Sequence, residues 1–244
     1  MAHEVQAEDE SRAGAAEVEE FMSVAAHDLR NPIAVVRASA QMAQRQMARG
    51  DQDAARGRLA AIVEQTDRLT EMIEMFVDAA RLGAGRLPLQ IENAVDLRDV
   101  VEAAIARTRL LTPDSDVREV EVDLPERCIG AWDRLRVVRA LRSLLSNALL
   151  YGAAGQAVSL VADEYEGRVR IRVSGGGPGP DAEEQQHLFE RFFRGKSAAD
   201  AGQAGSGLGL FVARGIARTH GGDVRRVEGD MFEIELPLTR PDKS

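Results

Sequence analysis

The sequence predicts an α+β chain in which a two-helix hairpin precedes an α/β sandwich. Two long runs, residues 15–48 and 59–80, repeat apolar side chains at intervals of three and four, the period of packed helices. After Gly83-Ala84-Gly85, short alternating apolar runs mix with single helical runs, a pattern typical of helices on one face of a mixed sheet. The change of pattern at these glycines indicates two domains.

Composition limits the classes of function. The 244 residues, 44% of them hydrophobic, suffice for two modest packed domains, and a net charge of -9 argues against nucleic-acid binding. The single Cys128 cannot form an internal disulfide, so we expect it to be a small buried residue. No run of 18 apolar residues occurs, and the first 20 residues are acidic and Ala-rich. We therefore expect a cytoplasmic chain that neither inserts into a membrane nor is secreted.

The first helix is expected over residues 15–48, after a frayed helical lead or disordered arm at 1–14. Pro32 lies inside this helix, where it removes one backbone donor and predicts a kink. His27 falls on the face opposite the apolar stripe, where a coiled-coil helix faces water. The stripe consists of Met22, Leu29, Val36 and Ala43, supported by Val18 and Ala25.

The second helix follows a turn at Arg49–Asp53 and carries a similar seam, formed by Leu59, Ile62, Thr66, Leu69, Ile73, Phe76 and Ala80. A two-helix hairpin buries only half of its apolar surface. Pairing with a second copy would complete a four-helix bundle, so we expect a homodimer. The alternative is a lone hairpin packed on the rest of the chain.

The second domain begins with a strand predicted at Leu87–Ile91, and Asp96 is placed to cap a helix running to about Leu111. The remaining expected strands are residues 117–124, 157–162, 168–173 and 232–236, and the remaining expected helices are 135–151 and 208–220. The predicted domains are thus an arm at 1–14, a helical domain at 15–84 and an α/β domain at 85–244.

Two groups of residues carry recognisable chemistry. Asp28 can hydrogen-bond the far ring nitrogen of His27, which fixes the tautomer and raises the basicity of the other nitrogen, although an exposed helix histidine is often only a solvated residue. Gly205, Gly207 and Gly209 precede a helix N-terminus, where free N–H groups attract phosphate. The amide oxygen of Asn147 suits Mg²⁺, but taken by itself its position at the end of a helix favours a capping or surface role.

The His27 segment and five later segments in order resemble the catalytic core of the sensor histidine kinases of two-component signalling, over roughly residues 15–238. They are the His27 segment Phe21–Pro32, Leu144–Ala148, Gly175–Gly179, Leu188–Arg194, and Gly205–Leu210 followed by His220-Gly-Gly222. The resemblance implies a histidine-kinase/chaperone-type ATPase fold after a dimeric four-helix bundle. It also implies a protein-histidine kinase that phosphorylates His27 from Mg-ATP and passes the phosphoryl group to an aspartate on the receiver domain of a response regulator.

The resemblance also implies roles for individual residues. Asp28 orients His27, and Asn31 either orients water for dephosphorylating the response regulator or is only a polar residue tolerated before Pro32. Phe189, Phe192 and Phe193 either anchor a mobile lid at about 195–204 or simply pack in the core. The implied nucleotide-binding residues are Asn147, which also holds the metal, Gly177, Gly179, Arg194, Gly205, Ser206, Gly207, Leu208 and Gly209.

The first glycine segment departs from the family pattern. Gly175 stands where an Asp normally accepts a hydrogen bond from the adenine amino group, and Asp181 lies too far along to replace it. The loss should cost about 1.5 to 3 kcal/mol of nucleotide affinity or relax base selectivity, and Gly175→Asp is expected to tighten ATP binding. Further departures are Ser143 for Asn, Leu150 for Lys or Arg, Met231 for Thr, and a shortened hairpin after Gly222.

Two other functions remain open. The first is a kinase-deficient signalling module that serves as a phosphotransfer, phosphatase or docking platform. Serine kinases and chaperones with the same ATPase fold explain the glycines but not the hairpin with His27-Asp28. Since only about 15 residues precede the histidine helix, we expect an input domain to be missing from this chain or a separate sensor protein to supply the signal.

Overall fold

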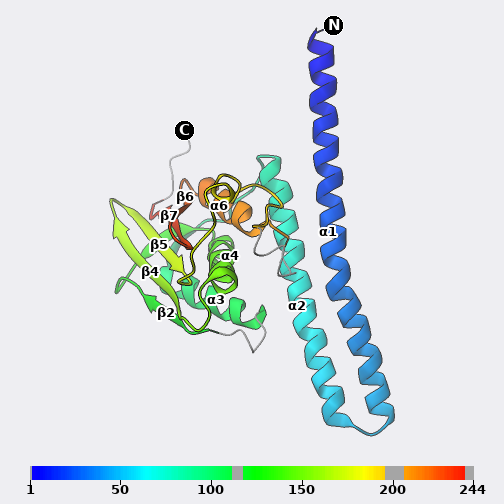
Figure 1. The fold of residues 1–244 in the computed structure, drawn as a ribbon. Coiled ribbons are helices and arrows are strands. Elements are labelled where there is room, and N and C mark those ends of the chain that lie inside the picture. Colours follow the sequence, from blue (N-terminus) through cyan, green and yellow to red (C-terminus); the bar gives the residue numbers. More distant parts are fainter. Residues whose placement is uncertain (1, 112–117, 196–205, 240–244) are drawn as a thin grey trace. The chain divides into compact units, whose positions relative to one another are not determined.

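The computed structural model describes residues 2–111, 118–195 and 206–239. The chain divides into two compact units, residues 1–76 and 77–244, which are described separately. Helices α1 (Ala2–Ala48) and α2 (Gln52–Gly83) form the predicted hairpin (Figure 1). The last residues of α2, 77–83, belong to the second unit.

The hairpin packs through small side chains and one aromatic pair. Helix α1 starts at Ala2, which agrees with the helical alternative for residues 1–14, and continues through Pro32. The side chain of Asp51 accepts the backbone N–H of Ala54 at 3.1 Å and so caps α2. Phe21 and Phe76 meet edge to face, with their ring centroids 5.8 Å apart.

The predicted apolar stripe of α1 is only partly covered in the single chain, where Leu29 and Val36 are half-buried. Ala43 is buried, whereas Met22 is 61% exposed. Exposed apolar side chains on α2 include Leu59, Val63 and Ile73. The hairpin thus covers only part of its apolar surface, as the sequence predicted.

The second unit contains a mixed five-stranded sheet in the order β2-β4-β5-β7-β6. Its strands are β2 (Val120–Asp123), β4 (Val158–Tyr165), β5 (Arg168–Ser174), β6 (Asp223–Glu228) and β7 (Met231–Pro237). The β2–β4 pair is parallel and the other pairs are antiparallel. A separate antiparallel pair joins β1 (Glu92–Asp96) to β3 (Ile129–Trp132).

Helices α3 (Leu97–Leu111), α4 (Arg134–Tyr151) and α6 (Gly209–Thr219) lie on one side of the sheet (Figure 1). The core between the two layers includes the fully buried side chains of Leu141, Leu145, Ile171, Ile216 and Ile234. The predicted α/β sandwich is therefore present.

The side chains of β5 alternate between the buried face of the sheet and the opposite face, which carries charged residues. Val169, Ile171 and Val173 are buried, and the arginines between them form ion pairs across neighbouring strands. These pairs are Arg168 with Glu235, Arg170 and Arg172 with Asp163, and Arg172 and Arg225 with Glu233. Cross-strand pairs of opposite charge support this sheet face.

Three details of the predicted domain differ from the structure, one of them being β6, which was not among the expected strands. Leu87–Ile91 is not a strand, because the β-pairing with β3 begins only at Glu92. Strand β3, with four residues, was missed. By contrast, Asp96 precedes α3 as expected, and its carboxylate accepts the backbone N–H of Arg98 at 2.9 Å.

Candidate functional site

The first candidate group lies on α1. The side chain of His27 is 70% exposed, and its Nδ1 lies 3.2 Å from Oδ1 of Asp28. With the proton on Nδ1, the ring donates to Asp28 and Nε2 keeps its lone pair. Asn31 is exposed one helical turn beyond His27, so both side chains occupy the same part of the helix surface.

The second candidate group is the N-terminus of α6. Leu208 precedes the helix and provides no side-chain cap, so the first N–H groups are not satisfied by a capping side chain. Gly207 has φ +68°, and a Cβ there would lie 2.5 Å from the backbone carbon of Phe192. Ser206 accepts the N–H of Leu208 at 3.4 Å. Gly205 and the predicted lid residues 196–204 lie outside the described residues.

Helix α4 places two polar side chains near this helix start. Ser143 and Asn147 are one turn apart, and a Cβ added at Gly209 would lie 3.7 Å from Oγ of Ser143. The hydroxyl of Ser143 is buried and has no hydrogen-bond partner in the part of the chain that the structure describes. No described residue forms a hydrogen bond with the half-buried side chain of Asn147. An orphaned hydroxyl, a free amide and uncapped N–H groups fit a Mg-triphosphate.

The first glycine segment packs tightly against neighbouring backbone. A Cβ on Gly177 would lie 2.2 Å from the carbonyl oxygen of Tyr151, and one on Gly179, where φ is +75°, would lie 1.8 Å from that of Gly229. A Cβ on Gly175 would lie 2.2 Å from the carbonyl oxygen of Ala148. The side chain of Gly175→Asp could therefore enter only if the backbone around Ala148 shifted, which opposes the expected gain in ATP affinity. That gain stays a prediction.

A carboxylate reaches this segment from another strand. Asp230, in the turn between β6 and β7, is only 4% exposed. Its Oδ2 accepts the backbone N–H of Gly175 at 2.8 Å, and its Oδ1 accepts the hydroxyl of Ser174 at 2.7 Å. Asp230 is not close to Gly175 in the sequence, from which it is 55 positions away, but the fold places its carboxylate beside the backbone of Gly175. The register of β5 and β7, which pairs Val173 with Phe232, brings the β6–β7 turn beside Gly175. Residues close to Gly175 in the sequence do not indicate this contact.

Arg118 holds the other side of the segment and was also missed. Its guanidinium donates to the carbonyl oxygens of Ala148 at 2.6 Å, Leu149 at 2.7 Å and Ala153 at 2.8 Å, and more weakly to that of Gly175 at 3.5 Å. The first two carbonyls belong to the last turn of α4, where a cation is favourable. Arg118 and Asp230 together fix the backbone of Gly175 from both sides.

The aromatic residues after the short helix η2 (Glu184–Gln186) are half-buried. Phe189 meets Phe232 edge to face at 6.3 Å, and Arg214 lies 4.5 Å over its ring. Phe193 contacts His187, with a ring distance of 5.7 Å. These contacts agree with the core-packing alternative, while the lid role stays a prediction. Arg194 is exposed.

His220 links the end of α6 to the start of α4 through hydrogen bonds of its ring. Its Nδ1 lies 2.8 Å from the carbonyl oxygen of Ile216, to which it can donate, and its Nε2 accepts the backbone N–H of Asp133 at 3.0 Å. Asp133 in turn caps α4 by accepting the N–H of Arg136. Burial lowers the pKa of His220 below its usual value, because the charged ring would lose its hydration. His220 therefore acts in the structure as a neutral connector.

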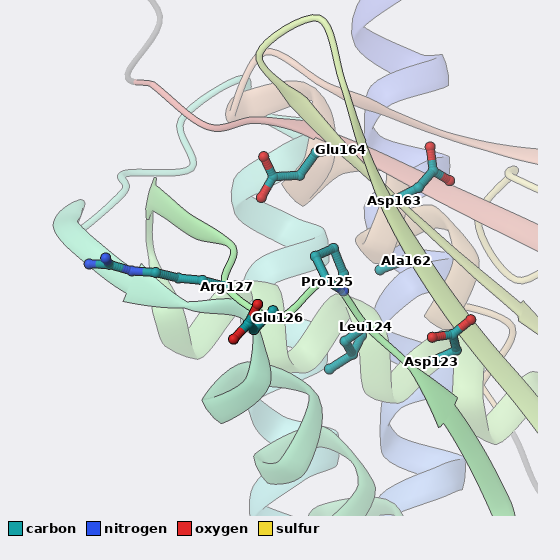
Figure 2. A pocket seen from close by; sticks show the side chains of 8 residues that line it. All are labelled: Asp123, Leu124, Pro125, Glu126, Arg127, Ala162, Asp163 and Glu164. Atoms are coloured by element: carbon teal, nitrogen blue, oxygen red, sulfur yellow. The ribbon is translucent and has the colours of Figure 1, made fainter.

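A shallow cavity of about 650 Å³ lies elsewhere in the second unit, beside β2 and β4 (Figure 2). Four carboxylates line it, together with Leu124, Pro125, Arg127 and Ala162; they belong to Asp123, Glu126, Asp163 and Glu164. Such a lining repels phosphates, so this cavity does not suit a nucleotide. Cys128 is buried as expected, and burial, aided by Glu164, raises its thiol pKa to about 12.

Two family models match the chain. Residues 17–85 match the His Kinase A (phospho-acceptor) domain, and residues 132–240 match the histidine kinase-, DNA gyrase B- and HSP90-like ATPase. The first match contains His27, Asp28 and Asn31. The second contains every proposed nucleotide-binding residue.

Similar curated proteins carry the name sensor histidine kinase. The sensor-like histidine kinase SenX3 of Mycobacterium bovis is 32% identical over 224 residues, which are 89% of this chain and 53% of that protein. The sensor histidine kinase MtrB of Mycolicibacterium paratuberculosis is 33% identical over 232 residues, 91% of this chain and 40% of that protein. The chain thus spans about half the length of the curated relatives it matches, or less.

Solved structures share the fold. The histidine kinase AdeS of Acinetobacter baumannii aligns with a TM-score of 0.59 at 23% identity, over 87% of this chain and 98% of that one. Full-length ShkA in complex with AMPPNP also gives a TM-score of 0.59, at 22% identity, over 91% of this chain and 46% of that one. Within the described residues, no helix is both long and apolar enough to cross a bilayer.

Proposed function

Because this chain belongs to the sensor histidine kinases of two-component signalling, we propose that it phosphorylates His27 from Mg-ATP and passes the phosphoryl group to an aspartate of a response regulator. The observation that carries the proposal is the exposed imidazole whose Nδ1 is held by Asp28. A nucleophile that a second domain must reach has to face solvent, and His27 does.

In the proposed reaction, Nε2 of His27 forms a bond to the γ-phosphorus while the bond from that phosphorus to the bridging oxygen breaks and ADP leaves. The ring gains positive charge as the bond forms. Asp28 offsets that charge through its hydrogen bond to Nδ1 and holds the ring in the reactive tautomer. Magnesium, when bound, neutralises charge on the phosphates.

The α/β domain would hold the nucleotide at the end of α4 and the start of α6. Asn147 is proposed to bind Mg²⁺, and the N–H groups around Gly207 and Gly209 to bind the phosphates. The uncapped helix start and the orphaned hydroxyl of Ser143 support this assignment. Gly177, Gly179, Arg194, Gly205, Ser206 and Leu208 stay predicted contributors.

We further propose that the hairpin pairs with a second copy. Met22 is 61% exposed, Val63 61% and Ile73 51%, which leaves apolar surface that water solvates poorly. A four-helix bundle would cover it. Light scattering on Val63→Glu/Ile73→Glu should give the mass of a monomer, where the unmodified chain gives that of a dimer.

Radiolabelling tests the kinase proposal. The chain is incubated with Mg²⁺ and γ-labelled ATP, and His27→Gln is compared with His187→Gln, a matched change at another solvent-accessible histidine. We expect acid-labile label in the unmodified chain and in His187→Gln, and none in His27→Gln. Asp28→Asn should slow labelling about a hundredfold without changing ATP affinity. Label that persists in His27→Gln would contradict the proposal.

The second candidate is a kinase-deficient signalling module, and the close packing at Gly175 favours it. The carbonyl oxygen of Ala148 occupies the space that a side chain at this position would need. A folded chain that acquires no label, yet accepts or removes phosphoryl groups in the presence of a phosphorylated response regulator, would support this alternative.

A further inference from the structure

Asp230 is a buried carboxylate that is surrounded by fewer hydrogen-bond donors than a buried negative charge usually requires. It is 4% exposed, and among the described residues it accepts only from the hydroxyl of Ser174 and the N–H of Gly175. No described residue forms an ion pair with it. Buried carboxylates are costly unless they are paired or fully hydrogen-bonded, so this one is suited to a further donor.

The two carboxylate oxygens of Asp230 still have acceptor positions for that donor. An ionised carboxylate offers about four acceptor positions, and each oxygen of Asp230 uses one. Both present donors are neutral. Ser174 is itself oriented, because its Oγ accepts the N–H of Gly176 at 3.2 Å while its hydroxyl points to Asp230. The acceptor is therefore held in place before any ligand arrives.

Asp230 lies at the glycine segment and not at the phosphate-binding helix start. The antiparallel register of β5 and β7 brings the β6–β7 turn beside Gly175. A nucleoside triphosphate presents acceptors at its phosphates, which a carboxylate repels, and N–H donors at the exocyclic amine of adenine, which a carboxylate attracts. Guanine and hypoxanthine present a carbonyl oxygen at the same ring position.

We propose that Asp230 accepts a hydrogen bond from the exocyclic amine of adenine and thereby makes the site select adenine over 6-oxopurines. The inference rests on the proposed function, since it requires that the glycine segments bind a nucleotide. Gly175 leaves no space for a side chain, and Asp230 supplies the acid from the neighbouring strand.

Calorimetry with Mg-ATP and Mg-ITP tests this role. ITP has the same sugar and phosphates as ATP but a carbonyl in place of the amine. The unmodified chain should bind ATP at least about tenfold more tightly than ITP. Asp230→Asn should bring the ratio to about one or below, because an amide can donate to the carbonyl of ITP. Glu228→Gln, which removes an exposed charge two residues away, should leave the ratio unchanged.

The outcomes separate the two proposals. Equal affinities of the unmodified chain for ATP and ITP, or an unchanged ratio in Asp230→Asn, would overturn the role of Asp230 while leaving nucleotide binding intact. An equal loss of both nucleotides in a folded Asp230→Asn would assign a merely structural role to the carboxylate. Absence of binding by either nucleotide to the unmodified chain would overturn the proposed function as well. Equal affinities of the unmodified chain would overturn the role of Asp230 even where the variant does not fold.

Discussion

The two ends of the candidate nucleotide site are built from opposite kinds of group. At the proposed phosphate end, the start of α6 has backbone N–H donors without a side-chain cap, and Gly207 allows the turn before them because its φ is +68°. At the proposed base end, the group that we assign to the ligand is an acceptor, the carboxylate of Asp230. The N–H donors depend on a local backbone conformation, so the sequence shows them as a glycine motif. The acceptor requires only that the fold place a carboxylate at this point, so the residue that supplies it can come from different positions in the chain.

The largest effect is expected from Gly175→Asp, which forces a side chain into the base end. Its Cβ would lie 2.2 Å from the carbonyl oxygen of Ala148, and its charge would be buried beside that oxygen. We expect the free energy of unfolding to fall by about 3 kcal/mol, as measured by urea denaturation. Gly57→Asp, at an open helix position, should change it little. A Gly175→Asp variant that is as stable as the unmodified chain and binds ATP more tightly would contradict the close packing described for Gly175.

The phosphate end offers a matched pair of smaller changes. Gly207→Ala places a Cβ at φ +68° and 2.5 Å from the backbone of Phe192, whereas a Cβ on Gly209 only contacts Ser143 at 3.7 Å. Gly207→Ala should lower the free energy of unfolding by about 1 to 3 kcal/mol and weaken ATP and ITP equally. Gly209→Ala should be neutral or slightly stabilising in thermal unfolding. Equal destabilisation by both changes would contradict the description of this turn.

A pH titration probes the connector that keeps α6 on α4. Because burial lowers the pKa of His220 in the folded chain, the unfolded chain binds a proton first as the pH falls below the usual value of 6.5. The stability that His220 contributes is present above that value and is lost as the pH falls toward its lowered pKa. Denaturation between pH 7.5 and 5.5 should therefore show a steeper loss in the unmodified chain than in His220→Gln. Identical slopes would mean that His220 does not titrate as a neutral buried group.

The smallest change is Ser174→Ala, which removes one of the two donors to Asp230. The expected loss of stability is about 0.5 to 1.5 kcal/mol by urea denaturation. The carboxylate stays bound to the N–H of Gly175, so the preference for ATP over ITP should persist, although weakened. Complete loss of that preference would indicate that the hydroxyl of Ser174, and not Asp230, recognises the base.

The sequence was sufficient for elements whose signals are local. Asp96 and the apolar period beyond it located α3, and the alternation of arginine with Val169 and Ile171 located β5. The strand expected at Leu87–Ile91 was misplaced, because its alternation was present but its partner β3 lies opposite residues 92–96. Strand β3 itself is too short for a periodic signal.

The candidate site divides in the same way. His27 with Asp28, and Gly207 with Gly209, are neighbours in the sequence, so their arrangement was predictable. The contact between Gly175 and Asp230 joins residues 55 positions apart, and it follows only from the order and register of the strands. A search for a nearby acid along the chain could not find it.

The central claim is that the glycine segments bind an adenine nucleotide with its phosphates at α6 and its base at Asp230. Backbone amide NMR of the labelled chain during titration with Mg-ADP tests it most directly. The account predicts saturable shifts of the amide signals of Gly175 and Gly176 together with those of Gly207 and Gly209. Absence of shifts at both groups, or shifts confined to the acidic cavity around Glu126, would contradict it.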